Sequence, residues 1–389
     1  MVLLLQMAKM ALCWRHCWRH ARGAVFCGLW LASILSGWLL LCCPLLPLLV
    51  LRPRAYRVCI DIVFAMWELY PAALIRVVLR TMVVVTGDAV SGGERSLLVM
   101  NHRTRLDWNF LWAGMHLAAR RGPQASRLKF VLKAPIAHVP GPGWVMQMAC
   151  HLYIHRNWEK DQQLLAQSLR FFKDTNHTCQ ILLFPEGTDL TAQSTARSDR
   201  WADTHGLPKY KFVLHPKTTG FVFLADTMRQ YKHLDAIYDV SVGYPRTLVQ
   251  SEVDLFQGSV PEEIHFHFKR YNLADIPESE NDLKLWLAQR WKEKEDKLCQ
   301  FYKDGYFKAA DSEMERREQE PTETALCLAL CFWTGLICLA IWLMLVSTAV
   351  QLYALTHAII FIVLSLIGSG AHILEIQLHQ ARHKYMKKK

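Results

Sequence analysis

The sequence predicts an α/β protein, with a mixed sheet and flanking helices, membrane-embedded helices before the sheet and a transmembrane hairpin after it. Between residues 81 and 310, short apolar runs rich in β-branched side chains alternate with segments of helical periodicity. No Asp, Glu, Lys or Arg occurs between Arg22 and Arg52, or between Glu323 and Glu375. Each gap exceeds the ~20 residues that are needed to cross a bilayer. Hydrophobic residues make up 52% of the 389 residues, which is high for a purely soluble chain.

Residues 1–80 are expected to form a basic N-terminal segment and membrane-embedded helices. The first apolar stretch follows four basic residues, but it is longer than the ~7–15 apolar residues of a signal peptide and therefore indicates a retained anchor. Two prolines near its end are expected to kink it. The next segment, residues 56–80, carries Asp61, Glu68 and Arg76 within it. We therefore expect it to lie at the membrane interface rather than to span the bilayer.

Residues 81–310 are expected to form the α/β domain. Strands are predicted at residues 82–85, 97–100, 129–132, 181–184, 237–242 and 264–268. Helices separate most of them, which predicts one mixed sheet. A strongly charged helix from 278 to 301 ends the domain, and its charges are typical of a solvated face.

The remainder of the chain is expected to return to the membrane. Residues 311–323 form a polar linker, and residues 324–376 are long enough for two transmembrane helices, with Gln351 and His357 near the bend. Residues 377–389 form a basic tail, which favours the cytosolic side. A complete hairpin would place the α/β domain on the same side as this tail.

The charge balance and the cysteines narrow the range of partners. The net charge of +11 suits anionic lipids and phosphate-bearing ligands, and because no nucleic-acid-binding motif accompanies it, nucleic acid is not an expected partner. The twelve cysteines lie mostly in or beside apolar stretches, without paired metal-ligand spacing, so no metal site is expected. The repeat CWRHCWRH at 13–20 could bind a metal, but its Trp and Arg side chains favour anchoring at the membrane interface.

A histidine and a carboxylate lie five residues apart where the strand 97–100 ends. His102 and Asp107 therefore fall in a strand-to-helix loop, where an α/β sheet can present side chains to a crevice. A carboxylate beside a neutral imidazole fixes its tautomer and stabilises the imidazolium that forms when it takes a proton. The pair is predicted to be a general base, with a structural hydrogen bond as the alternative.

A second segment, ILLFPEGTD at 181–189, also runs from an apolar strand into a polar turn. Together the two segments resemble the glycerolipid (1-acylglycerol-phosphate) acyltransferase family, whose members carry His, four residues, Asp and then Phe-Pro-Glu-Gly-Thr. The resemblance extends from about Thr86 to Tyr244 and includes GWVMQMACHLYIHR, which ends at Arg156. The strings NHRTRLDWNFLW and HPKTTGF and the closing pair of apolar segments resemble most the lysocardiolipin acyltransferase branch. Residues 81–310 are thereby identified as a catalytic domain.

The resemblance implies a membrane enzyme that moves a fatty acyl group from acyl-CoA to the free hydroxyl of a lysophospholipid. Acyl-CoA is then a co-substrate, and no cofactor is expected. The lipid hydroxyl is a poor nucleophile at neutral pH, so His102 would remove its proton while Asp107 holds the imidazole. No acyl-enzyme is required.

The substrate-binding residues are expected in four places along the chain. They are Lys133, Arg156, Glu186, Gly187, Thr188, Thr219 and Gly220. Arg156 and Lys133 are candidates for binding phosphate, although Lys133 fits an ordinary surface lysine nearly as well. Glu186 is expected to organise its turn or to contact the acceptor. Backbone N–H groups of the turn at 184–188, or those around Thr219 and Gly220, are alternative donors to the oxyanion.

One departure from the family pattern bears on the substrate. Most members continue the Glu-Gly-Thr turn with arginine or serine, whereas this chain has Asp189. A carboxylate repels a phosphomonoester dianion more than a phosphodiester. We therefore expect lysocardiolipin, lysophosphatidylinositol or lysophosphatidylglycerol as the acceptor, with lysophosphatidic acid as the alternative.

Two rival functions use the same sequence features. A non-catalytic lipid-binding membrane protein would have no need of the paired His102 and Asp107. A hydrolase of acyl-CoA or phospholipid would share them, although no Gly-x-Ser-x-Gly motif supports a serine hydrolase. The lysine-rich tail resembles an endoplasmic-reticulum retrieval signal imperfectly. The expected location is therefore the endoplasmic-reticulum membrane, with the mitochondria-associated membrane as the alternative.

Overall fold

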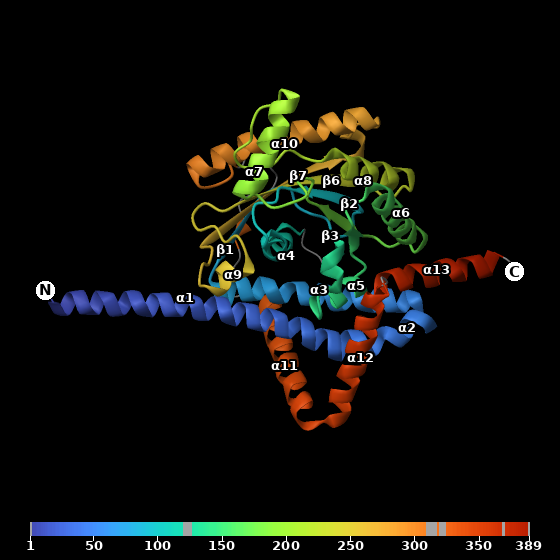
Figure 1. The fold of residues 1–389 in the computed structure, drawn as a ribbon, viewed down its shortest axis with the longest axis horizontal. Helices are drawn as coiled ribbons and strands as arrows, with labels where there is room; N and C mark the ends of the chain where they lie inside the picture. The colour runs from blue at the N-terminus through green and yellow to red at the C-terminus, as the bar shows by residue number, and fades with distance from the viewer. Residues whose placement is uncertain (1, 120–126, 309–316, 319–323, 368–369, 388–389) are drawn as a thin grey trace.

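A computed structural model describes residues 2–119, 127–308, 317–318, 324–367 and 370–387 (Figure 1). Within these ranges one sheet has the strand order β4-β3-β5-β2-β6-β7-β1-β8. The strands are β1 Met82–Gly87, β2 Ser96–Met100, β3 Leu128–Lys133, β4 Leu152–Ile154, β5 Gln180–Leu183, β6 Ala236–Gly243, β7 Glu263–Asn272 and β8 Arg317–Glu318. Neighbours are parallel except β6 with β7 and β1 with β8, so the sheet is mixed, as predicted.

All six predicted strands are confirmed, and two additional strands extend the edges of the sheet. β4 is only three residues long and β8 only two, which is too short for an alternating pattern to appear in the sequence. β8 lies within the stretch predicted as a linker, 311–323. The rest of that stretch lies outside the described residues.

Helices cover both faces of the sheet. Successive side chains of β2 point to opposite faces, so Leu97 and Val99 join one core while Leu98 and Met100 join the other. The first core is closed by α6 Trp158–Asp174, α8 Thr218–Gln230 and α10 Glu280–Asp304, and the second by α4 Asp107–Ala118 and the N-terminal helices. The prediction of a solvated helix at 278–301 is therefore only partly right, because α10 buries an apolar stripe that includes Trp291. The remaining short helices are α5 Pro142–Met148, α7 Ala192–His205 and α9 Glu252–Phe256, with 3₁₀ turns at Ala134–His138 and Leu273–Asp275.

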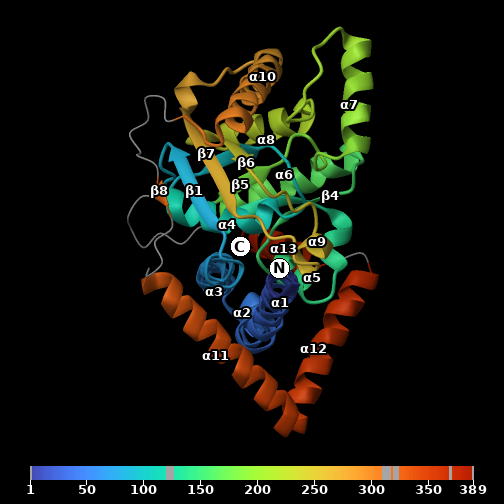
Figure 2. The same cartoon turned by 90° about the vertical axis from the view of Figure 1, so that its left-hand side faces the viewer.

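The N-terminal helices form a layer beneath the sheet (Figures 1 and 2). They are α1 Val2–Gly37, a π-helical turn Trp38–Cys42, a 3₁₀ turn Cys43–Leu45, α2 Leu46–Leu51 and α3 Pro53–Leu74, which continues as a π-helical turn Ile75–Leu79. Regular α-helix is interrupted around Pro44, as the prolines predict. Asp61 of α3 is buried and lies 3.1 Å from the ammonium of Lys129. This charge faces the domain, so Asp61 is not exposed on the helix surface, and the interfacial placement of residues 56–80 stays a prediction.

The C-terminal apolar helices leave the helix layer as a V (Figures 1 and 2). They are α11 Thr324–Val346 and α12 Thr348–Leu366, and α13 Ala371–Lys387 follows. The bend lies at Ser347, four residues before Gln351 and ten before His357, and α13 continues across the predicted boundary at 376. Four segments of the described chain are long and apolar enough to cross a membrane, namely His20–Leu51, Pro53–Leu79, α11 and α12.

Candidate active site

Two loops meet at one edge of the sheet because the strands before them are parallel neighbours. β2 pairs with β5 in parallel, so the loops that follow Met100 and Leu183 both leave at the carboxyl edge. The His102 N–H donates to Glu186 Oε1 at 3.3 Å, and the Leu190 N–H donates to the His102 carbonyl at 2.8 Å. The sequence-based expectation that both motifs share one end of the sheet agrees with this geometry.

The imidazole of His102 is held from two sides. Its Nδ1 lies 3.1 Å from Asp107 Oδ2, and its ring stacks on Phe184 with centroids 4.3 Å apart. The His102 side chain is 18% exposed, whereas that of Asp107 is 0% exposed. The carboxylate is therefore sealed from water, while the imidazole edge that carries Nε2 faces away from it and is free to meet a substrate.

Asp107 is fixed by further donors that the sequence did not identify. Tyr244 Oη donates to its Oδ1 at 2.6 Å, the Thr104 hydroxyl donates to the same oxygen at 3.1 Å, and the Thr104 N–H donates to Oδ2 at 2.9 Å. Burial and then the neighbouring Asp107 charge raise the pKa of Tyr244 well above its ordinary value, so its proton stays in place. Tyr244 follows β6, which is parallel to β2. That position after a neighbouring strand was the signal available for finding it.

Glu186 joins three distant segments beneath the Pro-Glu-Gly-Thr turn. Its carboxylate accepts from the His102 N–H, from the Leu214 N–H at 3.1 Å and from Trp291 Nε1 at 3.3 Å. Burial raises its pKa to about 8, although these donors favour the ionised form. The side chain is buried, and these three bonds fit the predicted role of organising the turn. Trp291 is a second residue that the sequence did not reveal.

Basic side chains surround the turn at the protein surface. Arg156 Nη2 donates to the Gly187 carbonyl at 3.0 Å. Lys217 Nζ lies 3.4 Å from the position that a Cβ atom at residue 187 would occupy. Gly187 has φ +73°, a conformation that favours glycine. Lys133 ends β3 and pairs with Ile154 of β4, two residues before Arg156, so it lies at the same edge, where burial and then the charge of Arg156 lower its pKa. Arg156, Lys133 and Lys217, called the basic rim below, are suited to binding phosphate.

Asp189 lies beside this rim with only 10% of its side chain exposed, and its charge is shared with several partners. Gln250 Nε2 donates to its carboxylate at 3.0 Å, Thr188 Oγ1 donates at 3.2 Å and Arg105 Nε lies 3.8 Å away. Burial acts to raise the pKa of Asp189, yet these hydrogen bonds outweigh it and leave the pKa lowered. The group is therefore a carboxylate at neutral pH, with Thr188 directed to it.

The predicted oxyanion donors occupy different positions relative to the turn. The Gly187 N–H already donates to the Phe184 carbonyl at 3.0 Å. Thr219 and Gly220 lie in the first turn of α8, and the Lys217 N–H just before them donates to the Pro185 carbonyl at 2.8 Å. The start of a helix has backbone N–H groups without acceptors inside the helix. This helix start therefore lies beside the turn with donors to offer.

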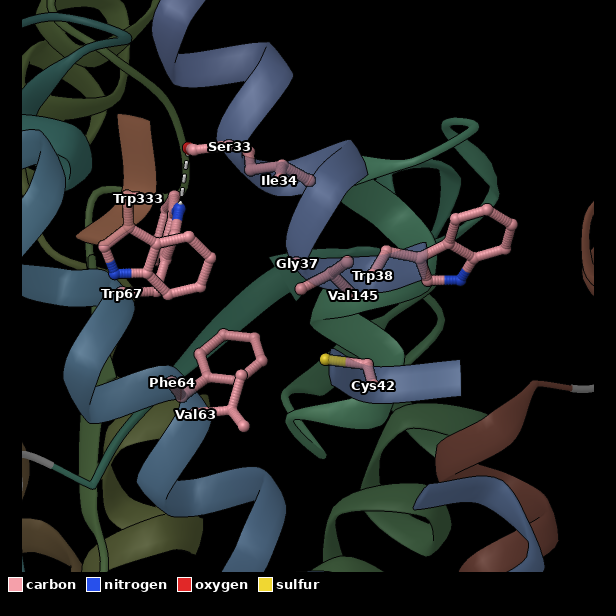
Figure 3. A pocket seen from close by; sticks show the side chains of 10 residues that line it. All are labelled: Ser33, Ile34, Gly37, Trp38, Cys42, Val63, Phe64, Trp67, Val145 and Trp333. Carbon is pink, nitrogen blue, oxygen red and sulfur yellow. Dashed lines mark hydrogen bonds between the residues drawn. The ribbon is translucent and has the colours of Figure 1, made fainter. Parts of the chain in front are cut away.

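An aromatic layer separates the site from the N-terminal helices. Trp108, directly after Asp107, packs edge-on against Trp30 at 5.8 Å and against Phe130 at 6.3 Å. Figure 3 shows a small cavity farther into this helix layer, lined from α1, α3 and α11, where Trp67 Nε1 donates to Ser33 Oγ. Its volume of about 10 Å³ is that of a single water, so it is a packing gap and not a chamber for a lipid chain.

The assembled groups suit proton transfer next to a phosphate-bearing ligand. A half-open imidazole with a buried carboxylate behind it can accept a proton, and the basic rim can hold an anion beside it. Within the described ranges, no group of three His, Cys, Asp or Glu side chains is placed to hold a metal ion.

Comparison with known proteins identifies the family. Residues 82–244 match the family model described as Acyltransferase, and residues 254–333 match the one described as Acyltransferase C-terminus. Lysocardiolipin acyltransferase 1 of Gallus gallus is 39% identical over 347 residues, which cover 88% of this chain and 91% of the relative. The chain belongs to the acyltransferase family. The resemblance recognised in the sequence is thereby confirmed.

Two further similarities accompany this assignment. Lysophosphatidylinositol acyltransferase 10 of Caenorhabditis elegans is 36% identical over 255 residues, which cover 65% of this acyltransferase and 64% of the relative. The crystal structure of the 1-acyl-sn-glycerophosphate acyltransferase PlsC from Thermotoga maritima is 15% identical and has a TM-score of 0.46, covering 71% of this chain and 97% of that one. The long apolar helices at both ends fit a membrane protein.

Proposed function

We propose that this acyltransferase moves a fatty acyl group from acyl-CoA to the free hydroxyl of a lysophospholipid. The observation that carries the proposal is the half-open His102 imidazole, backed by a sealed Asp107 and bordered by the basic rim. The rim fits the phosphates of both proposed substrates. Relatives whose names state that they acylate lysocardiolipin and lysophosphatidylinositol support the acceptor class.

The reaction requires a base and no covalent enzyme intermediate. The neutral His102 carries its proton on Nδ1, where it donates to Asp107, and leaves Nε2 as the base. Nε2 takes the proton of the lysolipid hydroxyl while the hydroxyl oxygen attacks the thioester carbonyl. The tetrahedral intermediate then expels the CoA thiolate, which takes the proton from the imidazolium. The new ester and free CoA are the products.

The oxyanion of the intermediate needs donors close to the base. We assign this role to the start of α8, around Thr219 and Gly220, since the Lys217 N–H fixes that helix start to the Pro185 turn. The positive end of the helix dipole would add to the stabilisation. Gly187 contributes the backbone conformation of the turn rather than an oxyanion donor, because its N–H group already donates to the Phe184 carbonyl.

The test of the function is His102→Ala in isolated membranes, with radiolabelled acyl-CoA and a panel of lysophospholipids. Transfer should fall to the background, because the imidazole acts on the transition state, while expression and retention of acyl-CoA stay the same. Release of free fatty acid is measured in parallel, since a hydrolase would release it without transfer. Normal transfer by the variant would reject the base assignment.

Asp189 supports a phosphodiester acceptor, with lysocardiolipin first and lysophosphatidylinositol and lysophosphatidylglycerol next. Its carboxylate stays ionised at the rim, where it opposes a phosphomonoester dianion more than a monoanionic phosphodiester. Gln250 and Arg105 hold the charge in place rather than remove it. The Asp189→Arg variant should therefore use lysophosphatidic acid better relative to lysocardiolipin. If the ratio of the rates with lysophosphatidic acid and lysocardiolipin does not change, Asp189 gives no reason to exclude lysophosphatidic acid as an acceptor.

The shape of the helix layer supports a membrane topology. α11 has 23 residues and α12 has 19, enough for about 30 Å each at 1.5 Å per residue, which matches the hydrocarbon core. Both legs of the V return to the side of the sheet (Figure 1). We propose that the hairpin crosses the endoplasmic-reticulum membrane, that α1 and α3 lie along its surface, and that the site and the C-terminal tail face the cytosol. Protease protection of epitopes at Ser347 and at the tail tests this arrangement.

A further inference from the structure

A second basic cavity opens at the other end of the sheet from His102. It has a volume of about 650 Å³ and lies where the start of α3, Arg127 just before β3, the loop before β5, and α13 come together. Its cationic lining residues are Arg52, Arg54, Arg57, Arg127 and Arg382, against the acidic residues Asp61, Asp174 and Glu375. A volume of this size is typical of a small-ligand site.

The cavity is separate from the candidate active site. Arg127 precedes β3 and His177 precedes β5, so both lie at the amino edge of the sheet. His102 and Pro185 lie at the carboxyl edge of the same parallel strands. Six residues of β3 separate the two edges by about 20 Å at 3.3 Å per residue. A ligand in the cavity would therefore not touch the proton-transfer groups.

The wall of the cavity is a built ionic network. Arg57 is buried and pairs with Glu375 of α13, and it also donates to the Met148 carbonyl at 3.0 Å. Asp61 is compensated from behind by buried Lys129 at 3.1 Å. Glu375 and Asp61 are thus each paired with a cation of the wall. This network joins α3, β3 and α13 and fixes the shape of the cavity.

In the part of the chain that the structure describes, the arginines at the mouth have no such compensation. Among the described residues, no carboxylate pairs with Arg52, Arg54 or Arg127, whose side chains are exposed or half-buried. Arg382 donates to the Val50 carbonyl, which brings its guanidinium to the same mouth. Guanidinium groups bind phosphate through two parallel hydrogen bonds. One further lining carboxylate, Asp174, stands against these four arginines, so the mouth offers a net positive charge to an anion.

The location indicates where that anion comes from. Figure 1 shows α13 continuing from α12 beside the corner between α2 and α3, in the layer between the sheet and the V. Basic pockets at this level on the cytosolic side of membrane helices bind anionic lipid headgroups. We propose that the cavity is a second, non-catalytic site for the phosphodiester headgroup of an anionic phospholipid of the surrounding bilayer.

The probe is phosphatidylglycerol, added to the detergent-purified full-length protein, with phosphatidylcholine and inorganic phosphate as the comparison ligands. A ligand that binds only the folded state raises the thermal unfolding midpoint in proportion to the logarithm of its concentration. Phosphatidylglycerol should raise the midpoint more than phosphatidylcholine does. A rise with inorganic phosphate and none with the lipid would overturn the lipid assignment.

The decisive variant is Arg54→Gln with Arg127→Gln, which removes two mouth charges that make no ion pair among the described residues. Each lost arginine should weaken phosphatidylglycerol binding about fivefold, so about 25-fold together. Arg200→Gln on α7, an exposed arginine on the opposite side of the sheet, is the matched control and should respond like the wild type. A double variant that binds phosphatidylglycerol as the wild type does would overturn the proposal.

Two controls separate this site from the proposed reaction. His102→Ala should lose acyl transfer and keep the full response to phosphatidylglycerol. Native mass spectrometry should retain fewer anionic lipids on the double variant than on Arg200→Gln, which gives a readout independent of thermal unfolding. Equal retention on both variants would contradict a site at the cavity mouth.

Discussion

Replacing Asp107 by asparagine isolates the role of its charge, because the surrounding donors dictate how the new amide must lie. Oδ2 receives two N–H donors, from Thr104 and from His102 Nδ1, while Oδ1 receives two hydroxyls, from Thr104 and Tyr244. An N–H cannot accept a hydrogen bond, but a hydroxyl can. The asparagine oxygen should therefore take the Oδ2 position and its NH₂ group should face the hydroxyls. The imidazole then keeps its tautomer.

The expected loss in Asp107→Asn is the electrostatic stabilisation of the imidazolium. Two unit charges about 4 Å apart interact by about 4 kcal/mol at the effective dielectric constant of about 20 that suits such pairs. At 1.36 kcal/mol per tenfold change, this corresponds to a decrease of about 10³ in kcat. KM values for acyl-CoA and lysolipid should stay the same, because neither ground state carries the imidazolium.

The assay is the initial rate of radiolabelled acyl transfer in membranes, with Asp107→Ala as the matched variant. Alanine leaves the buried Thr104 N–H without an acceptor, at a cost of about 1–3 kcal/mol, and releases the imidazole. Its kcat and its thermal midpoint should both fall below those of Asp107→Asn. The reasoning is refuted if Asp107→Asn stays within tenfold of wild type, or if it is no more active than Asp107→Ala.

Two further predictions concern the groups around the pair. Tyr244→Phe removes a 2.6 Å hydrogen bond to the buried carboxylate of Asp107, so the protein should lose about 1.5–3 kcal/mol of stability. The thermal midpoint and kcat should both fall, with KM unchanged. A wild-type midpoint would show that the bond contributes nothing to stability. Burial raises the pKa of Glu186 from 4.5 to about 8, so between these values the folded protein holds a proton that the unfolded chain has lost, and stability should fall as pH rises from about 5 to 8, by at most about 1.4 kcal/mol per pH unit. Glu186→Gln should remove this part of the slope in thermal unfolding, and parallel pH profiles of variant and wild type would contradict it.

The fold was predictable wherever an element is long enough to carry a pattern. β6, with eight buried residues, is visible in the sequence, whereas β4 is too short. The bend of the V was predicted only approximately because polar residues were taken to mark it. His357 Nδ1 instead bonds to the Tyr353 carbonyl and Gln351 Nε2 donates to the Met344 carbonyl, so both polar groups are satisfied by helix backbone. Ser347 makes the break because its hydroxyl caps α12.

The candidate site was predictable where its residues follow strands that carry a recognisable motif. His102, Asp107 and Glu186 lie in such loops, and parallel pairing of β2 with β5 is sufficient to bring them together. Tyr244 also follows a strand, but its contact with Asp107 depends on packing across 137 residues of sequence. Trp291 reaches Glu186 from the middle of α10, 105 residues away, and no local pattern in a helix announces such a bond. Spacing reveals the groups that share a loop, but not the supports that arrive from elsewhere.

The three bonds to Glu186 have a consequence for protein engineering. One carboxylate is shared by the backbone at His102, the backbone at Leu214 and the indole of Trp291. A chimera that receives only the Pro-Glu-Gly-Thr turn of another family member would therefore contain a buried glutamate whose three hydrogen-bond donors come from the original protein. These donors need not fit the new turn. Successful grafts should need the loop at Leu214 and the facing stretch of α10 to be transplanted with the turn, as one cassette.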